Sequence, residues 1–143
     1  MEHQLPWSEA KAHCDQHYQG LAAIYNADDQ LVLNNLLGIH NQSGFVWIGG
    51  RAWQTSRWPY RGWYWFSANT VIPFSFQNYR NWEATSEPWP EYGKCVYAYG
   101  VENGQENLGK WFSEVCGTLA PFVCKRSHGE DPDALQTGFS GII

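Results

Sequence analysis

The stretch from residue 111 to residue 124 is Trp-Phe-Ser-Glu-Val-Cys-Gly-Thr-Leu-Ala-Pro-Phe-Val-Cys, and it contains the features that decide the fold. Two short runs, Lys110–Ser113 and Phe122–Lys125, predict strands, because aromatic and β-branched residues pack well on a pleated surface. Two of the chain's four cysteines, Cys116 and Cys124, lie in this stretch. The sequence therefore predicts a sheet here that disulfides tie to other parts of the chain.

The four cysteines, Cys14, Cys95, Cys116 and Cys124, predict two structural disulfides. No two of them form a C-x-x-C pair, which excludes a zinc ribbon and a thioredoxin-type redox site. The alternative is four reduced, buried thiols in a cytosolic protein, since disulfides persist in oxidising compartments. Their spacing leaves all three pairings open. A Cys14–Cys124 bridge would stabilise the fold by roughly 4–5 kcal/mol and a Cys95–Cys116 bridge by roughly 3 kcal/mol.

The composition indicates one globular domain rich in aromatic residues. The chain has 143 residues, which is one domain's worth, and aromatic residues make up 17% of it. Its net charge of −5 argues against a nucleic-acid or anionic-membrane partner, since both carry negative charge. No apolar run approaches the roughly 20 residues of a membrane span, so we expect no membrane insertion within this chain.

The motif Asn41-Gln42-Ser43 is a candidate N-glycosylation site and agrees with the compartment that the cysteines indicate. No signal peptide is visible, because the residues that follow Met1 predict the start of a helix instead. We therefore expect a secreted protein or the extracellular domain of a membrane protein, with the export signal outside this sequence. On this interpretation the sequence is a fragment or an incomplete gene model.

Two helices come first along the chain. The first is predicted over Ser8–Tyr18, with Ser8 as its N-cap and Gly20 as its C-terminal stop. Its apolar residues recur at steps of three and four and place Cys14 on the buried face. The second helix has two acidic residues in its first turn, where the helix dipole favours negative charge, and it is predicted to end at Gly38.

Strands and loops follow the helices, which indicates an α+β domain with segregated elements. A buried central strand is predicted at Phe45–Ile48, closed by Gly49 and Gly50. Further strands are predicted at Trp63–Phe66 and Cys95–Tyr99. Between Ile72 and Tyr92 the sequence has no sustained period and three prolines, which predicts a long ordered loop of functional importance. Residues 127–143 lack periodicity and predict a flexible tail or linker.

The chain resembles a C-type lectin-like domain over residues 5–126. The resemblance is carried by the following residues in order: Trp7-Ser8-Glu9-Ala10, Cys14, Leu21-Ala22, Trp47-Ile48-Gly49, Trp63-Tyr64-Trp65, Trp82, Glu87-Pro88, Cys95, Trp111, Cys116 and Phe122-Val123-Cys124. It implies a domain over 1–126, with two helices packed on short antiparallel sheets, a long loop region, and the bridges Cys14–Cys124 and Cys95–Cys116. Members of the family usually begin with a strand before the first helix, and that strand is truncated here.

In sugar-binding members of the family, a calcium ion beside the long loop contacts the sugar. Its ligands are a Glu-Pro-Asn or Gln-Pro-Asp triplet, a nearby acid, and an Asn-Asp pair after a Trp. This chain has Trp89, Phe112 and Ser113 where the family has the asparagines and the aspartate. Calcium needs six to eight oxygens, and only Glu87, with Glu91 or Glu114, remains to supply them. We therefore expect no calcium cofactor; the alternative is a calcium-dependent lectin with altered ligands.

On this interpretation the Glu87-Pro88 turn is a retained part of the scaffold, with a cis peptide bond before Pro88. Trp111 is expected to be a core residue rather than a ligand contact. Phe74 and Phe76 are expected to fill the core beneath the loop. The candidate ligand-binding residues are Glu87, Trp89, Glu91, Trp53, Trp58 and Arg80, because exposed Trp and Arg side chains dominate binding hot spots and Trp also stacks on sugar rings.

Enzyme functions are not supported by the sequence. His13 and His17 share a helix face, but the segment lacks the glutamate of a metalloprotease helix and offers no third ligand. Neither a phosphate-binding loop nor a nucleophile elbow is present. We therefore expect an extracellular recognition module that is not an enzyme and that binds a glycan or protein ligand.

Overall fold

The computed structural model describes residues 4–53, 61–67, 70–104, 106–125 and 141–142. The two helices are α1 (Trp7–His17) and α2 (Ala27–Ile39). The main sheet is antiparallel in the order β3-β2-β1-β4-β5, with the strands β1 (Phe45–Trp53), β2 (Gly62–Ser67), β3 (Thr70–Pro73), β4 (Lys94–Tyr99) and β5 (Trp111–Val115). The predicted α+β class is confirmed. None of the described helices is long and apolar enough to cross a membrane.

A smaller sheet pairs β6 (Val123–Cys124) with β7 (Gly141–Ile142) in parallel. Within the predicted tail, 127–143, only the two residues of β7 are described, so the tail itself stays a prediction. Leu5 and Ala120 exchange two backbone hydrogen bonds of 3.0 and 3.2 Å just before α1. This single bridge lies where the resemblance implies a truncated first strand.

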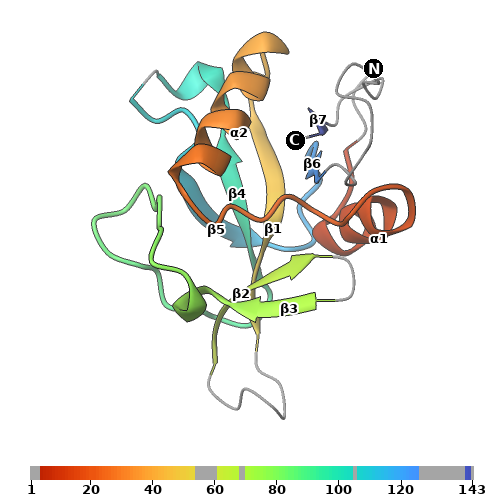
Figure 1. Cartoon of the computed structure of the whole chain (residues 1–143), viewed down its shortest axis with the longest axis vertical. Helices are drawn as coiled ribbons and strands as arrows, with labels where there is room; N and C mark the ends of the chain where they lie inside the picture. Colours follow the sequence, from red (N-terminus) through yellow and green to blue (C-terminus); the bar gives the residue numbers. More distant parts are fainter. Residues whose placement is uncertain (1–3, 54–60, 68–69, 105, 126–140, 143) are drawn as a thin grey trace.

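The sheet has a helix on each side (Figure 1). Alternate residues of β1 point to opposite faces, as the two-residue period of a strand requires. Val46 and Ile48 pack with Leu33 and Leu37 of α2 in one buried cluster. Trp47 on the other face packs with residues of α1 in a second cluster. The long loop covers the same face of the sheet as α2, and its buried aromatic residues belong to the first cluster.

Both predicted disulfides are present with the implied pairing. Cys14 on α1 is bonded to Cys124 on β6, across 110 positions of sequence. Cys95 on β4 is bonded to Cys116, just after β5. No described cysteine is left as a free thiol. The first bridge ties the two ends of the domain together, and the second joins neighbouring segments of the main sheet.

The predicted ends of three elements are wrong. Pro6 rather than Ser8 is the N-cap of α1, and no side chain caps that end. Helix α2 continues one residue past Gly38. Strand β1 does not stop at Gly49 and Gly50 but continues to Trp53. A Cβ atom on Gly50 would lie 2.6 Å from the Val96 side chain, so this glycine is required for close packing between strands rather than for a turn.

Tyr97 at the centre of the second cluster gives the first testable expectation. It is fully buried, its ring stacks on Trp47, and burial raises the pKa of Tyr97 to about 12. An unfolded tyrosine ionises near pH 10. Between pH 10 and pH 12 the folded state therefore keeps a proton that the unfolded state releases, and stability falls as the pH rises through this window.

Tyr97→Phe is expected to remove this contribution. Urea unfolding at pH 8 and pH 11 should show the unchanged chain losing about 1 kcal/mol more between the two values than the Tyr97→Phe variant loses. Tyr25→Phe provides a control at a partly buried tyrosine whose pKa burial also raises. Equal losses in the unchanged chain and the Tyr97→Phe variant would contradict the expectation.

Candidate functional site

The long loop, residues 77–93, joins the short 3₁₀ turn η1 (Phe74–Phe76) to β4 and is fastened to the main sheet. The backbone N–H of Trp111 donates to the carbonyl of Asn81, and the N–H of Glu83 donates to the carbonyl of Trp111, both at 2.8 Å. At the far end of the sheet, Trp63 Nε1 donates to the carbonyl of Pro88 at 2.8 Å. The prediction of a long ordered loop is confirmed.

Aromatic side chains fill the space between the loop and the sheet. Trp82 and Trp111 are buried with their ring centroids 5.7 Å apart, and Phe74 lies against both. The core role predicted for Trp111 and Phe74 is confirmed. Phe76 is 59% exposed, so its predicted core role is wrong, because the 3₁₀ turn carries it to the outer side of the loop.

Glu87 is engaged by two donors. Its Oε1 accepts from Arg80 Nε at 3.0 Å and from Trp82 Nε1 at 3.1 Å. Arg80 is held in place because its Nη1 also donates to the carbonyls of Gln77 and Tyr79, at 2.7 and 2.9 Å. A cation therefore already neutralises the carboxylate that the resemblance associates with calcium. The described residues contain no cis peptide bond, so the expected cis bond before Pro88 is wrong.

The other positions associated with calcium offer little to a metal ion. Phe112 lies on the opposite face of β5 from Trp111 and stacks on Tyr99, with centroids 4.3 Å apart. Glu114 also lies across the sheet from the loop, since alternate residues of a strand point to opposite faces. Among the described residues, no group of three His, Cys, Asp or Glu side chains is arranged to hold a metal.

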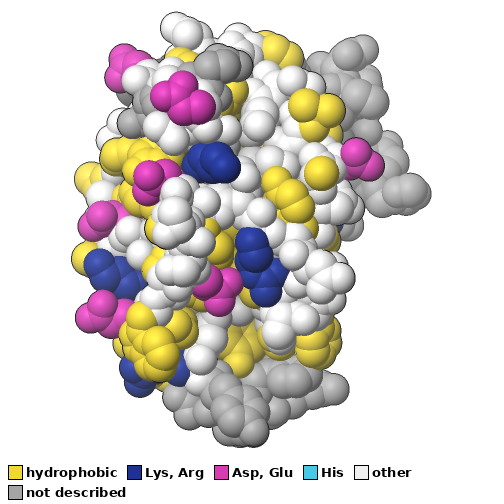
Figure 2. All heavy atoms as spheres, turned by 90° about the vertical axis from the view of Figure 1, so that its left-hand side faces the viewer, with side chains coloured by type: hydrophobic (Ala, Val, Ile, Leu, Met, Phe, Trp, Pro, Cys, Tyr) yellow, Lys and Arg dark blue, Asp and Glu magenta, His cyan; other side chains and the backbone are white. Residues whose placement is uncertain are grey.

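A pocket of about 300 Å³ is lined in part by Glu87 and its two donors, Arg80 and Trp82. It brings the cations Arg80 and Lys110 together with the hydroxyls of Thr85 and Ser86. Figure 2 shows the face that contains the long loop, with basic and acidic side chains close together among hydrophobic ones. Lys110 is not recognisable from the sequence as a residue of this pocket, because only the pairing of the loop with β5 brings it to the same pocket as Arg80.

Aromatic and basic side chains meet where β1 ends and the loop approaches β4; we call Trp53, Tyr92 and Arg61, together with Trp89 three residues earlier on the loop, the aromatic surface. Trp89 is 75% exposed and Tyr92 is about half exposed. The Tyr92 ring centroid is 6.3 Å from that of Trp53 and 4.4 Å from the Arg61 guanidinium carbon. Neither Tyr92 nor Arg61 is among the predicted ligand-binding residues, and the predicted Trp58 lies outside the described residues.

Arg51 supports the aromatic surface from within. Its guanidinium carbon lies 4.7 Å from the centroid of Trp53 and 5.2 Å from that of Trp7. Burial lowers the pKa of Arg51. Contact with an aromatic face stabilises a partly desolvated cation, so this side chain links the buried Trp7 to the partly exposed Trp53.

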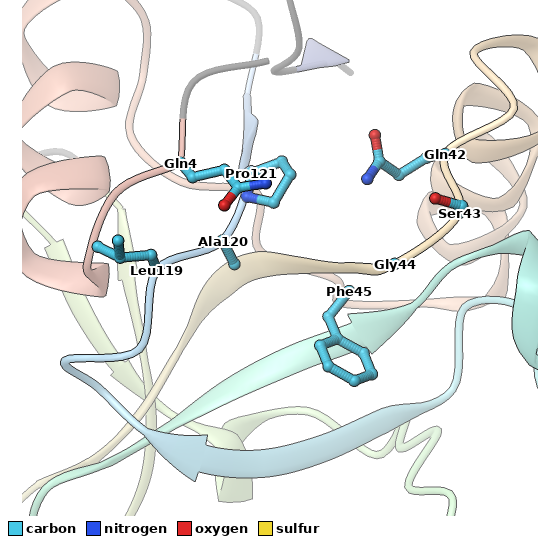
Figure 3. Close-up of a pocket in the computed structure, with 8 residues that line it drawn as sticks. All are labelled: Gln4, Gln42, Ser43, Gly44, Phe45, Leu119, Ala120 and Pro121. Carbon is cyan, nitrogen blue, oxygen red and sulfur yellow. The ribbon is translucent and has the colours of Figure 1, made fainter.

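A second, smaller pocket of about 210 Å³ lies away from the loop, between the start of β1 and the segment before β6 (Figure 3). Gln42 reaches over it toward Pro121, and Phe45 and Leu119 lie on its lower side. Small-molecule sites are usually about 300–1,000 Å³, so this pocket is small for a ligand site. It contains none of the predicted ligand-binding residues.

The family follows from the comparison of the sequence with known domains. A model described as the lectin C-type domain matches residues 3–126. This chain belongs to the C-type lectin domain family. The two bridges and the helix-flanked sheet agree with the fold that the resemblance implied.

Known relatives of this C-type lectin domain are distant. L-selectin from Bos taurus is 29% identical over 122 residues, which cover 84% of this chain but only 29% of L-selectin. The chain thus spans less than a third of that relative. A lectin C-type domain from C. elegans superposes with a TM-score of 0.66 at 21% identity, covering 99% of this chain and 88% of the other. The lectin SPL-2 from Saxidomus purpuratus, described as Ca²⁺-independent, superposes with a TM-score of 0.61 at 20% identity. The match covers 85% of this chain and 78% of SPL-2.

Proposed function

We propose that this C-type lectin domain is an extracellular recognition module that binds a glycan or protein ligand at the aromatic surface without calcium. The observation that carries the proposal is the engagement of Glu87 by Arg80 and Trp82. To bind calcium there, the ion would have to displace a guanidinium and an indole N–H. It would gain only one or two carboxylates in exchange, whereas calcium takes six to eight oxygen ligands.

The chemistry of the aromatic surface supports ligand binding. Trp and Tyr bury large rigid areas at little cost in conformational entropy, and together with Arg they dominate binding hot spots. Trp89 projects from the loop with 75% of its surface exposed, although a tryptophan gains free energy when it is buried. A sugar ring or a protein side chain stacked on Trp89 would bury this area.

The extracellular location and the absence of enzymatic activity belong to the same proposal. Two disulfides bridge the described part of the chain, and such bridges persist in oxidising compartments. The His13 and His17 rings lie 4.7 Å apart, but His13 also packs against Phe122, and the described residues provide no third ligand nearby. Neither histidine has an arrangement that a metal-dependent hydrolase requires.

Calcium independence can be tested directly. Titration calorimetry with calcium at millimolar concentration should give no binding heat. The purified domain should then be used to probe a glycan array and an array of extracellular proteins. Each array should give the same ligands with about 2 mM calcium as with about 2 mM EDTA. This calcium concentration is roughly the range in which extracellular calcium modules bind the ion. Saturable calcium uptake, or loss of all ligands in EDTA, would make the calcium-dependent lectin the correct function.

Trp89→Ala is expected to weaken binding of the ligand found in this way by at least about 30-fold, because hot-spot truncations cost 2 kcal/mol or more. The melting temperature should change little, since the side chain is mostly exposed. Leu119→Ala is the matched control, because Leu119 is also an exposed large apolar residue but lines the small pocket instead of the aromatic surface. If Trp89→Ala binds normally, the aromatic surface is not the site.

A further inference from the structure

The motif Asn41-Gln42-Ser43 follows α2 after one intervening residue, His40, and takes no part in the proposed ligand site. Asparagine, any residue except proline, and then serine or threonine is the acceptor motif for N-linked glycans. Gln42 in the middle position is turned over the small pocket, while Asn41 and Ser43 are both exposed. The acceptor and the hydroxyl that the motif requires are thus both open to the solvent.

The backbone here has a structural reason for Asn41 that needs no glycan. The N–H of Asn41 donates to the carbonyl of Gly38 at 3.1 Å, and the N–H of Gln42 donates to that of Leu37 at 3.0 Å. This is a Schellman turn with Asn41 at a φ of 49°. Asparagine tolerates this left-handed conformation better than other residues with a side chain. The turn accounts for Asn41 but not for Ser43, and its hydrogen bonds use the backbone of Asn41 and not the side-chain amide.

We propose that Asn41 carries an N-linked glycan; this rests on the extracellular location proposed above. The donor is an oligosaccharide on a lipid pyrophosphate. The amide nitrogen of Asn41 forms a bond to the anomeric carbon of the first sugar, the bond from that carbon to the pyrophosphate oxygen breaks, and the amide loses one proton. The asparagine remains an uncharged amide, so the modification changes bulk and hydration rather than charge.

The surroundings of Asn41 give this glycan a physical role. Ile39, two residues before the acceptor, is 80% exposed, and Leu31 and Val32 of the same helix are also exposed. A hollow of about 570 Å³ beside them is lined by Leu31, Asn34, Asn35, Gly38, Ile39 and Leu108. Exposed large apolar side chains that gather on one helix promote association of soluble proteins. A hydrated glycan at Asn41 covers this end of α2.

The glycan does not compete with the proposed ligand site. Asn41 follows the end of α2 at the top of Figure 1, whereas the long loop lies toward the lower left. The two regions are well separated in this view, and a separation seen in projection is a lower limit to the true one. Glycosylation and ligand binding can therefore be measured independently.

The test uses the full chain with an added secretory signal, expressed in cultured human cells. The secreted, disulfide-bonded protein should have a mass above that of the polypeptide. Peptide N-glycosidase F should return it to the polypeptide mass and leave aspartate at position 41 in the peptide map. A secreted protein with both disulfides and the bare polypeptide mass would overturn the proposal.

Three variants separate the motif from the turn. Ser43→Ala removes the required hydroxyl and should abolish the mass increase, while Ser43→Thr should retain it. Asn41→Gly also abolishes it, and glycine suits the positive φ, so this variant folds normally. A mass increase that persists in Ser43→Ala would overturn the assignment. All three should bind ligand as the unchanged chain does, so failure of glycosylation is distinguishable from failure of the proposed function.

The covering role has its own readout. Ser43→Ala from the same cells should bind more of an apolar fluorescent dye than the glycosylated chain, and adding Ile39→Ser should reverse at least half of the increase. Equal dye binding by the glycosylated chain and Ser43→Ala would show that the glycan does not cover α2.

Discussion

Replacing both Cys14 and Cys124 with serine is expected to lower the free energy of unfolding by about 4–5 kcal/mol. The bridge spans 110 positions of sequence. Without it the unfolded chain gains conformational entropy, which stabilises the unfolded state relative to the folded one. For a chain of 143 residues, such a loss corresponds to a fall in melting temperature of roughly 15 °C. Calorimetry and urea unfolding of the double variant would measure it.

The other bridge is the matched control. Cys95 and Cys116 are 21 positions apart, so replacing both with serine should cost only about 3 kcal/mol. Chain entropy in the unfolded state therefore predicts the order of the two effects as well as their size. A larger loss from the Cys95/Cys116 pair would mean that contacts made by the cysteines in the folded sheet outweigh chain entropy.

Trp111→Ala is expected to cost about 3–5 kcal/mol and to loosen the long loop at the same time. The side chain is fully buried, and its Nε1 donates to Gln30 Oε1 on α2 at 3.0 Å. Its truncation would leave a cavity and an unpaired buried oxygen. Its ring also contacts Trp82 and Tyr79 of the loop. Chemical unfolding should show the stability loss, and hydrogen exchange should show faster exchange in residues 77–93.

Trp111→Phe separates packing from the hydrogen bond. Phenylalanine keeps a ring among the neighbouring aromatic residues but leaves Gln30 Oε1 without its donor, which should cost about 1–3 kcal/mol. Exchange in the loop should then stay close to that of the unchanged chain. If Trp111→Phe loosens the loop as much as Trp111→Ala does, the link to α2 rather than the ring contacts fastens it.

The sequence predicted most of the fold because its resemblance to a known family implied the order of the elements and the pairing of the cysteines, which their spacing alone left open. The spacing of Cys14, Cys95, Cys116 and Cys124 survives any uncertainty in element boundaries. Boundaries themselves depend on tertiary contacts. Gly50 was predicted to close a strand, but it pairs with Trp65 inside β1, where the absence of a side chain makes room for Val96 and Phe74.

The candidate site was predicted only in part, since it is built from an irregular loop. Glu87 and Trp89 were found from the triplet that resembles the family motif. The pairing of Arg80 with Glu87 could not be found, because a separation of seven residues in a loop without a period implies no contact. Tyr92 and Arg61 meet only where the loop passes the end of β1, and nothing in the sequence marks that approach.

The fastening of the long loop has a consequence for the thermodynamics of recognition. Its two main-chain links to Trp111 and its link from Trp63 are already made in the free protein. A partner that docks on such a preorganised platform pays little to order it, so association should be fast and much of the interaction energy should survive as affinity. A synthetic peptide of residues 77–93, which must assume this shape from a random coil, should bind far more weakly.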